Sequence, residues 1–479
     1  DKVIQLNYKE QSKTDTADVV VEVYHNMKDV LLAWTRLIVL SDVDVLIGYN
    51  IFGFDFKFMY ECAQVCDCVD EFMQIGRMKG FVQKMHVQGH NIKDKNKKQS
   101  TDDMAHNIEM HGRLVIDLFK VIQTSYNLDS YKLDNVCEKF LYKNKNDLPP
   151  KEIFRMQKGN SADRCTIAKY CIIDCVLCNR LLIKLQILMN NIGMSNVCSV
   201  PLMYLFLRGQ GIKGLSFVSK ICRSKGYLIN TLKKQEETSE KYEGAIVLKP
   251  TTKIYIEDPV CVADFNSLYP SCMISENLSH DSLAGVYNCY KCKDIEKMES
   301  KDEKCTCYEF DSKVWKYAYI DNVEYVDIQY DIYDYIDDYT AQGLLKKEKK
   351  KIKSGIKTCR FAQLSEGKKS IIPEILQELL KQRKNTRKIQ KNFPEKSFEW
   401  NIYEGLQLAY KITANSIYGL TGAQTSKIYL PEIAASTTAT GRNLIKFTKK
   451  HYESHYDCKV VYGDSVTGDT PVIIRNRGV

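Results

Sequence analysis

The sequence predicts a mixed α/β fold that is divided into several domains. Its 479 residues exceed the usual length of one domain. Short apolar runs that are typical of buried strands occur at 259–263 and 458–461. Longer stretches with helical spacing, such as 166–185 and 403–419, alternate with these runs. Both kinds of element are therefore expected along most of the chain.

The bulk composition limits the classes of function. A hydrophobic content of 44% is sufficient for large packed cores and argues against general disorder. The net charge of +9, from 69 Lys and Arg against 60 Asp and Glu, fits a polyanionic partner only if the basic residues gather on one face. The 18 cysteines stand without a secretory signal, which indicates reduced thiols in an intracellular, not a secreted, protein. No apolar run approaches about 18 residues, so no membrane helix is predicted.

Two motifs with carboxylates lie in the first 200 residues. Asn50 and Asp55 form an Asn-x-x-x-Phe-Asp arrangement after an apolar run. Tyr170 and Asp174 are four residues apart on the predicted helix 166–185, which places them on one face. That helix is apolar over most of its surface, so we expect it to be largely buried. Either motif alone is better explained by a capping aspartate or an ordinary helix pair.

Three further motifs follow in a fixed order. Asp264 ends the apolar run 259–263 and begins the segment Asp-Phe-Asn-Ser-Leu-Tyr-Pro-Ser. A Lys-x-x-x-Asn-Ser-x-Tyr-Gly segment starts at Lys411, and a Tyr-Gly-Asp turn ends at Asp464. A lone acid at a strand end is usually a structural cap, and a helix that ends on glycine is ordinary. The shared order and residue types favour a catalytic explanation.

In this order the motifs resemble those of family B DNA polymerases, in particular the delta-like branch. The resemblance covers nearly the whole chain. It implies an RNase H-like 3′-5′ exonuclease domain at 1–200, a first palm segment at 201–345, helical fingers at 346–400 and a second palm segment at 401–464. We expect the chain to be a piece of a longer protein, with the thumb beyond its end. The implied reaction is extension of a primer 3′-hydroxyl with dNTPs, assisted by two Mg²⁺ ions at each site.

The resemblance also assigns roles in the polymerase site. Asp264 and Asp464 are the expected metal ligands, and Lys411 is expected to contact the triphosphate or protonate pyrophosphate. Tyr269 is expected to exclude a 2′-hydroxyl from the sugar pocket. The other residues expected to bind the dNTP are Phe265, Ser267, Leu268, Arg383, Arg387, Asn415 and Tyr418. Those expected to contact DNA are Tyr242, Gly244 and Gly419.

The implied exonuclease site is incomplete in this sequence. Asp55 and Asp174 match the exo II and exo III positions and are the expected metal ligands, with Tyr170 orienting the attacking water. The Asp-x-Glu of the exo I motif is not found in residues 1–42, and we expect it to precede the first residue.

The motif around Asp464 departs from the family pattern. The second carboxylate of motif C is expected two residues further on, where Val466 stands. Instead, Ser465 begins a Ser-Val-Thr-Gly-Asp-Thr-Pro-Val run that resembles the start of an intein. Residues 465–479 are therefore predicted to open a self-splicing intein, in which Ser465 attacks the preceding carbonyl in an N-to-O acyl shift. A divergent hairpin loop is the alternative.

A cysteine cluster in the first palm segment allows two explanations. Its Cys-x-x-Cys start matches zinc-ligand spacing, but its Cys-x-Cys end is tighter than in most structural sites, so free thiols in a surface insertion are the alternative. The cluster consists of Cys289, Cys292, Cys305 and Cys307. The acidic, Tyr-rich stretch 318–339 that follows is expected to be an edge hairpin or insertion.

The expected partners are primer-template DNA, dNTPs and a sliding clamp, at a nuclear or viral replication site. Two rival functions stay open. A nuclease that does not polymerise would degrade a primer without extending it. A catalytically inactive, polymerase-like DNA-binding protein would bind DNA in a salt-sensitive way without Mg²⁺-dependent turnover.

Overall fold

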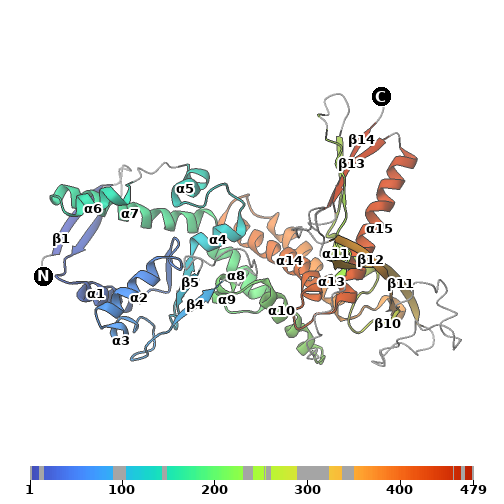
Figure 1. Cartoon of the computed structure of the whole chain (residues 1–479), viewed down its shortest axis with the longest axis horizontal. Helices are drawn as coiled ribbons and strands as arrows, with labels where there is room; N and C mark the ends of the chain where they lie inside the picture. The colour runs from blue at the N-terminus through green and yellow to red at the C-terminus, as the bar shows by residue number, and fades with distance from the viewer. Residues whose placement is uncertain are drawn as a thin grey trace, which may run out of the picture. The chain divides into compact units, whose positions relative to one another are not determined.

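The computed structural model divides the chain into two compact units (Figure 1). Unit 1 comprises Asp1–Leu188 and Leu202–Leu207, and unit 2 comprises Met189–Pro201 and Arg208–Val479. The structure describes residues 3–9, 16–89, 104–142, 148–229, 241–252, 254, 260–287, 323–336, 350–456, 458–464 and 470–476. Over these ranges, no helix combines the length and the apolar character that a membrane crossing requires.

Unit 1 mixes short strands and helices. Its strands are β1 (Val3–Lys9), β2 (Thr16–Glu22), β3 (Val45–Gly48), β4 (Met85–Gly89), β5 (Met104–Ile108) and β6 (Leu114–Asp117). Its helices are α1 (Met27–Leu40), α2 (Asp55–Val65), α3 (Val69–Phe72), α4 (Leu118–Ser125), α5 (Leu133–Leu141), α6 (Pro150–Gln157), α7 (Ser161–Lys184) and α9 (Leu202–Leu207). The described strands pair as β1 with β2, β3 with β6, and β4 with β5, and only β3 and β6 run parallel.

The parallel pair carries the core of unit 1. Ile116 in β6 and Leu118 at the start of α4 are fully buried and pack with Ile122 and Leu181. In the register of this pair, Gly48 lies opposite Asp117. Parallel strands bring their carboxyl ends to the same edge, so the loops that leave β3 and β6 lie together.

Helix α7 confirms the predicted helix 166–185 but starts five residues earlier. It begins with a capping box, in which Asn160 and Asp163 exchange side-chain and backbone hydrogen bonds. The expectation that it is largely buried is wrong. Its fully buried residues lie only in the C-terminal half, at Leu177, Cys178 and Leu181, because that half packs on the core around β3 and β6.

Unit 2 contains two sheets and four long helices among its described residues. Its strands are β7 (Lys241–Tyr242), β8 (Val247–Leu248), β9 (Val260–Phe265), β10 (Leu283–Tyr287), β11 (Glu324–Ile336), β12 (Lys350–Gln363), β13 (Cys458–Asp464) and β14 (Thr470–Asn476). Its helices are α10 (Gln210–Ser224), α11 (Leu268–Ser275), α13 (Ile371–Gln390), α14 (Phe398–Gly422), α15 (Pro431–His455) and the 3₁₀ turn η2 (Ser365–Gly367). Helix α8 (Ile187–Cys198) begins at the end of unit 1 and lies mainly in unit 2.

The first sheet has the strand order β10-β12-β11-β7. Of the two alternatives for 318–339, the edge position is wrong for the described part, because β11 pairs with β12 on one side and with β7 on the other. An insertion stays a prediction. Residues 350–363, at the start of the segment predicted as helical fingers, form the strand β12 instead of a helix. Its pairing with β11 along Lys350–Gln363 overrides the local preference for a helix.

The second sheet has the order β8-β13-β14-β9, and every pair in it is antiparallel. The run 259–263 is confirmed as the strand β9, but its predicted burial is wrong. Val260, Cys261 and Val262 are exposed, because β9 is the edge strand and the described residues do not cover it. Figure 1 shows α15 running beside β13 and β14, and α15 packs against β13.

Candidate active site

The segment that follows β9 forms a tight turn into helix α11. Ser267, the residue before α11, adopts a left-handed conformation with φ of 51° and is 3% exposed. The hydroxyl of Ser271 donates to the carbonyl of Asn266 over 2.9 Å, and the amide of Ser271 donates to the carbonyl of Ser267 over 2.9 Å. A buried non-glycine residue in this conformation is held there by its surroundings. The turn therefore leaves Asp264 exposed at the end of β9 and places Leu268 and Tyr269 in the core.

Three tyrosines from distant parts of the sequence meet next to this turn. The ring centroids of Tyr269 and Tyr418 are 4.5 Å apart with an interplanar angle of 39°. The hydroxyl of Tyr418 in turn shares a hydrogen bond with that of Tyr242. Burial raises the pKa of Tyr242 and of Tyr418, so both hydroxyls stay neutral at physiological pH. Tyr269, Tyr418 and Tyr242, predicted from three separate motifs, thus lie in one cluster.

Helix α15 holds the segment that carries Tyr242 and Gly244. The guanidinium of Arg442 donates to the carbonyl of Gly244 over 2.7 Å and to that of Glu243, and it lies 3.5 Å from the Glu243 carboxylate. Thr438 adds a hydrogen bond from its hydroxyl to the carbonyl of Glu243 over 3.1 Å. These contacts fix the backbone of the segment and leave Gly244 exposed.

The backbone brings the two expected metal-binding positions to one end of the second sheet. Pro471 of β14 pairs with Asp264, and Val472 pairs with both Ala263 and Gly463. Asp464 is the last residue of β13 and thus lies two strands away from Asp264, at a backbone separation of about 10 Å. The exposed carboxylate of Asp264 offers the oxygen ligands that Mg²⁺ prefers, so this position fits the expected ion.

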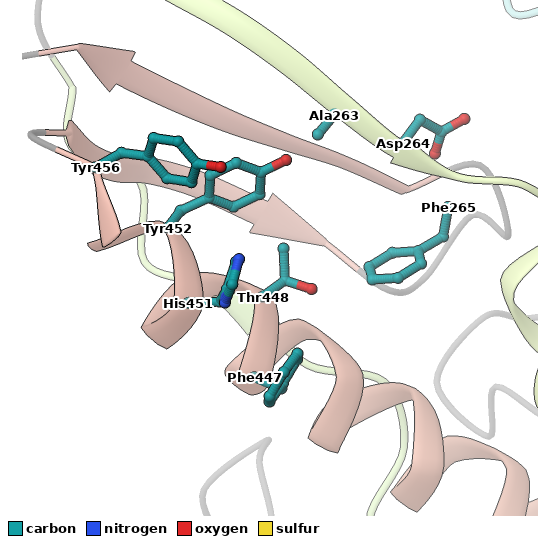
Figure 2. Close-up of a pocket in the computed structure, with 8 residues that line it drawn as sticks. All are labelled: Ala263, Asp264, Phe265, Phe447, Thr448, His451, Tyr452 and Tyr456. Atoms are coloured by element: carbon teal, nitrogen blue, oxygen red, sulfur yellow. The ribbon is translucent and has the colours of Figure 1, made fainter. Parts of the chain in front are cut away.

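A cavity of about 320 Å³ lies behind the Asp264 carboxylate. Its walls come from β9, from the C-terminal half of α15 and from the residue that follows α15. The lining residues are Ala263, Asp264, Phe265, Phe447, Thr448, His451, Tyr452 and Tyr456. Figure 2 shows Phe265 turned toward α15, whereas the carboxylate of Asp264 turns away from it. This alternation follows from the pleat of the strand. The cavity therefore lies on the opposite side of the sheet from the carboxylate.

The predicted basic residues of the fingers lie on helix α13. Arg383 is half-buried and donates a hydrogen bond to Gln407 on α14, whereas Arg387 is exposed. On α14, Lys411 and Asn415 are half-buried and Gly419 is exposed. The Asn415 Oδ1 atom is buried and accepts no hydrogen bond from the described part of the protein. Since burying an unsatisfied acceptor is costly, Asn415 is suited to meet a ligand.

The exonuclease residues all lie in unit 1. Asp55 begins α2 and is exposed as a residue. Nearby atoms of the protein nevertheless desolvate its carboxyl group in part, which raises the pKa of Asp55. Tyr170 and Asp174 lie on α7, which packs against β3. The loop after β3 leads to Asp55.

Sequence reasoning missed Asp117, which organises that loop. Its carboxylate is 1% exposed and accepts hydrogen bonds from the amides of Asn50 over 2.8 Å, Phe52 over 3.1 Å and Phe119 over 3.0 Å. Burial raises the pKa of Asp117, and these three amides act in the opposite direction. The one feature of the sequence that marks Asp117 is its place directly after the apolar run 114–116.

Several predicted residues fall outside the described ranges. These are Ser465 and the four cysteines Cys289, Cys292, Cys305 and Cys307. In the parts of the chain that are described, no group of three or more His, Cys, Asp or Glu side chains could hold a metal ion. Zinc therefore has no support from the structure.

Known proteins match both units. The sequence model of DNA polymerase family B matches residues 200–470, and that of its exonuclease domain matches residues 3–136. The DNA polymerase of Pyramimonas orientalis virus is 38% identical over 90% of this chain and 41% of its own length. The DNA polymerase delta catalytic subunit of Dictyostelium discoideum is 33% identical over 91% of this chain and 34% of its own length.

The fold is also similar to that of a solved structure. The structure of the family B DNA polymerase from Pyrobaculum calidifontis is similar with a TM-score of 0.61 and 22% identity, over 97% of this chain and 49% of that one. The chain thus spans less than half the length of these relatives. The predicted mixed α/β fold and the predicted family are confirmed: this chain belongs to DNA polymerase family B.

Proposed function

We propose that the protein to which this chain belongs is a DNA-directed DNA polymerase that extends a primer 3′-hydroxyl with dNTPs. The contact between Tyr269 and Tyr418 carries the proposal. It packs the turn that presents Asp264 onto the helix that presents Lys411 and Asn415. A carboxylate, a cation and an unsatisfied amide oxygen on adjoining elements suit the sugar, phosphates and base of one nucleotide.

Each part of this surface has a role in the proposed reaction. Asp264 and Asp464 would hold Mg²⁺, which members of this family use. When bound, the metal ions activate the attacking oxygen and stabilise the leaving pyrophosphate. Tyr269 closes the sugar pocket, and Lys411 binds the triphosphate together with Arg383 on α13. Arg387 stands where the family usually has lysine, so it keeps the charge but changes the geometry of the contact.

The test is primer extension by the protein expressed from its full gene, compared with its Asp264→Asn variant. We expect the wild type to extend the primer and the variant to bind primer-template DNA without extending it. Glu324→Gln, which changes an exposed carboxylate at the start of β11, is the matched control and should extend normally. DNA binding by the wild type without extension would instead favour the inactive DNA-binding protein.

We further propose a 3′-5′ exonuclease in unit 1. The family match to the exonuclease domain supports it, and Asp55 lies within that match. Asp55 and Asp174 would hold metal ions, and Tyr170 would orient the attacking water. Degradation of single-stranded DNA by the wild type but not by Asp174→Asn is the expected result. Equal degradation by both proteins would exclude Asp174 from the site.

The intein is also a proposal. Ser465 follows the last residue of β13 directly, and the family match ends at residue 470. The Ser465 hydroxyl would attack the carbonyl carbon of Asp464, so that the peptide C–N bond breaks, an ester C–O bond forms, and the hydroxyl proton passes to the freed amine. Mass spectrometry of the expressed full gene product should show a spliced protein, and Ser465→Ala should leave the precursor intact. A mature wild-type protein that still contains residues 465–479 would contradict the proposal.

Primer-template DNA and dNTPs are the substrates that this function requires. A sliding clamp and a nuclear or viral replication site stay predictions.

A further inference from the structure

Four polar side chains form a continuous chain of hydrogen bonds between α13 and α14. Arg383 Nε donates to Gln407 Oε1 over 3.2 Å, and Gln407 Nε2 donates to Glu404 Oε1 over 2.9 Å. Gln390 Nε2 donates to the other carboxylate oxygen, Glu404 Oε2, over 2.6 Å. Gln407 is 9% exposed and Gln390 is 6% exposed, so the chain lies inside the contact between the two helices.

The neighbours of Gln407 determine how its amide is oriented. A guanidinium group only donates hydrogen bonds, and an ionised carboxylate only accepts them. The amide oxygen of Gln407 must therefore face Arg383, and its amino group must face Glu404. The second carboxylate oxygen of Glu404 accepts the hydrogen bond from Gln390. The position of each of the four side chains therefore depends on its hydrogen-bonded neighbour.

A hydrogen bond at Nε fixes the plane of an arginine side chain. The guanidinium is rigid and planar, so once Nε is held, the directions of both Nη groups are also set. The Nη groups carry the parallel donors with which arginine grips a phosphate. A long side chain that is ordered before the ligand arrives loses less conformational entropy on binding. The bond to Gln407 thus prepares Arg383 to bind an anion.

We propose that Gln407 is a positioning residue for nucleotide binding: it holds Arg383 in the orientation in which α13 receives the triphosphate of the incoming dNTP. This inference rests on the proposed polymerase function and on the role of Arg383 in it. The hydrogen bonds through Glu404 and Gln390 anchor Gln407 and thereby link α13, in the expected fingers, to the part of α14 in the expected second palm segment. A purely structural role would instead make Gln407 important for stability, independently of Arg383.

The test is a double-mutant cycle on the full-length protein, with single-nucleotide incorporation as the assay. Gln407→Ala should raise the KM for dNTP about tenfold, as expected for the loss of a hydrogen bond to a charged group, with kcat nearly unchanged. In the Arg383→Ala background, the same substitution should have no further effect on KM. Gln382→Ala is the matched control, because Gln382 on α13 makes a similar 2.6 Å bond to Glu378 on the exposed surface. It should leave KM unchanged.

A second pair of variants, in which the glutamine and the glutamate exchange places, distinguishes lost orientation from misfolding. Gln407→Glu alone places two carboxylates side by side and should raise KM. Combined with Glu404→Gln, it restores an acceptor facing Arg383 and a donor–acceptor pair behind it, so KM should return toward the wild-type value. This recovery would show that the direction of the hydrogen bonds along the four side chains, not the identity of residue 407, determines the affinity for the nucleotide.

The outcomes separate this inference from the proposed function. A wild-type protein that binds primer-template DNA but incorporates no nucleotide would overturn both. If the wild type incorporates nucleotides, an unchanged KM in Gln407→Ala would overturn the positioning role alone. So would a further increase in KM when Gln407→Ala is added to Arg383→Ala.

Discussion

The guanidinium of Arg442 donates a hydrogen bond of 2.7 Å to the main-chain carbonyl of Gly244, 198 residues earlier in the chain. The side chain of Arg442 is 7% exposed and also bonds the carbonyl of Glu243. Lys351 of β12 binds the Glu243 carboxylate from another side, at 3.3 Å. One buried arginine thus connects α15 to the segment that we expect to contact DNA.

Arg442→Ala should loosen this segment and weaken DNA binding. The substitution removes the donor of the Gly244 carbonyl and leaves the Glu243 carbonyl with the Thr438 hydroxyl alone, so we expect a local destabilisation of about 1 kcal/mol. Hydrogen exchange of the amides at 242–246 should become faster, and the Kd for primer-template DNA should rise at constant salt. Lys446→Ala removes an exposed cation one turn later on α15 and is the control. If both variants behave alike, the effect belongs to net charge and not to the hydrogen bonds.

Gly441→Ala should disturb Tyr269 without unfolding the protein. A Cβ atom at position 441 would lie 3.3 Å from Tyr269 Cε1 and 3.6 Å from Leu268 Cδ2, so the tyrosine ring must move by a few tenths of an ångström. Alanine is a better helix former than glycine by about 1 kcal/mol, which offsets the crowding. We therefore expect a similar melting temperature but a changed ratio of dNTP to rNTP incorporation. The neighbouring variant Thr440→Ala is the control and should leave that ratio unchanged. An unchanged ratio in Gly441→Ala would show that Tyr269 does not determine the choice of sugar.

The positions of the motifs could be predicted from the sequence because each motif is local. The strand that leads to Asp264 and the helix that carries Lys411 depend on residues close in the chain, and both predicted elements are confirmed, as β9 and α14. The family follows from their order. The meeting of Tyr242 with Tyr418 depends on a contact between distant segments, which no single stretch of sequence encodes.

The residues that sequence reasoning missed all act at long range. Asp117 bonds amides 65 and 67 residues earlier in the chain, and Gln407 bonds Arg383 across two helices. An isolated acid or glutamine has many ordinary explanations, so nothing marks these positions before the fold is known. The exposure of β9 was missed for a related reason: an apolar run predicts a strand but does not say which elements cover it.

His280 should make the stability of unit 2 depend on pH. Its Nε2–H group donates to the carbonyl of Ile428 over 3.1 Å. Burial lowers the pKa of His280 below its ordinary value of 6.5, while the Ile428 carbonyl and the Asp281 carboxylate act in the opposite direction. Below pH 6.5 the unfolded chain takes up a proton that the folded protein does not bind. Stability is therefore full above this pH and falls as the pH decreases, by at most about 1.4 kcal/mol per pH unit.

The check is a pair of melting curves at pH 7.5 and pH 5.5 for the wild type and for His280→Gln. Glutamine keeps a donor for the Ile428 carbonyl but does not titrate. The difference between the two melting temperatures should be smaller in the variant than in the wild type. An equal or larger difference would assign the pH dependence to other groups.

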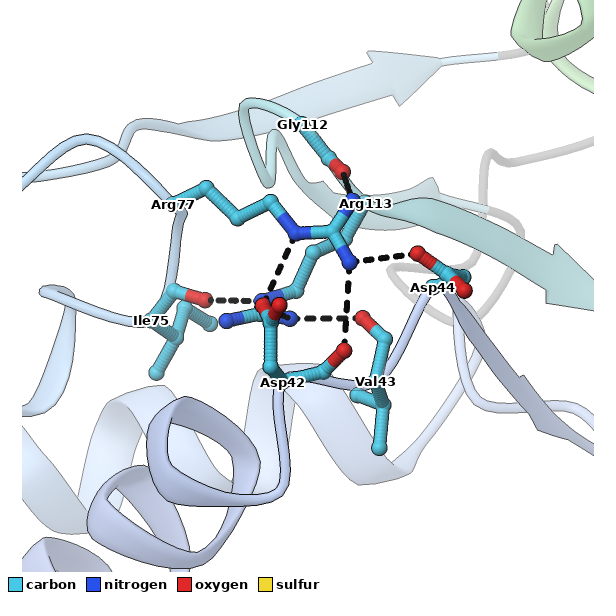
Figure 3. Close-up of polar contacts among 7 residues, drawn as sticks. All are labelled: Asp42, Val43, Asp44, Ile75, Arg77, Gly112 and Arg113. Atoms are coloured by element: carbon cyan, nitrogen blue, oxygen red, sulfur yellow. Dashed lines mark hydrogen bonds and ion pairs between the residues drawn. The ribbon is translucent and has the colours of Figure 1, made fainter.

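Two arginines of unit 1 bind the same aspartate but differ in burial (Figure 3). The side chain of Arg113 is 1% exposed. Its Nε donates to the carbonyl of Ile75 over 3.0 Å, and its Nη1 donates to the carbonyl of Val43 over 2.6 Å and lies 3.1 Å from Asp42 Oδ1. Arg77 is 36% exposed and binds Asp42 Oδ1 over 2.9 Å and also Asp44, whose side chain is 82% exposed. The ion pairs of Arg77 are screened by solvent, whereas the buried Arg113 side chain donates to the carbonyls of Ile75 and Val43.

Arg113→Ala should therefore destabilise unit 1, whereas Asp44→Ala should change its stability little. Removing Arg113 leaves the carbonyls of Ile75 and Val43 without a donor, at a cost of about 3 kcal/mol. Native-state hydrogen exchange of the amides in β3 and β6 measures this locally, because these strands begin next to the two arginines. Raising the salt concentration should reduce any effect of Asp44→Ala but leave that of Arg113→Ala in place. A comparable loss of protection in both variants, removed in both by salt, would mean that charge attraction and not the buried hydrogen bonds holds this part of unit 1 together.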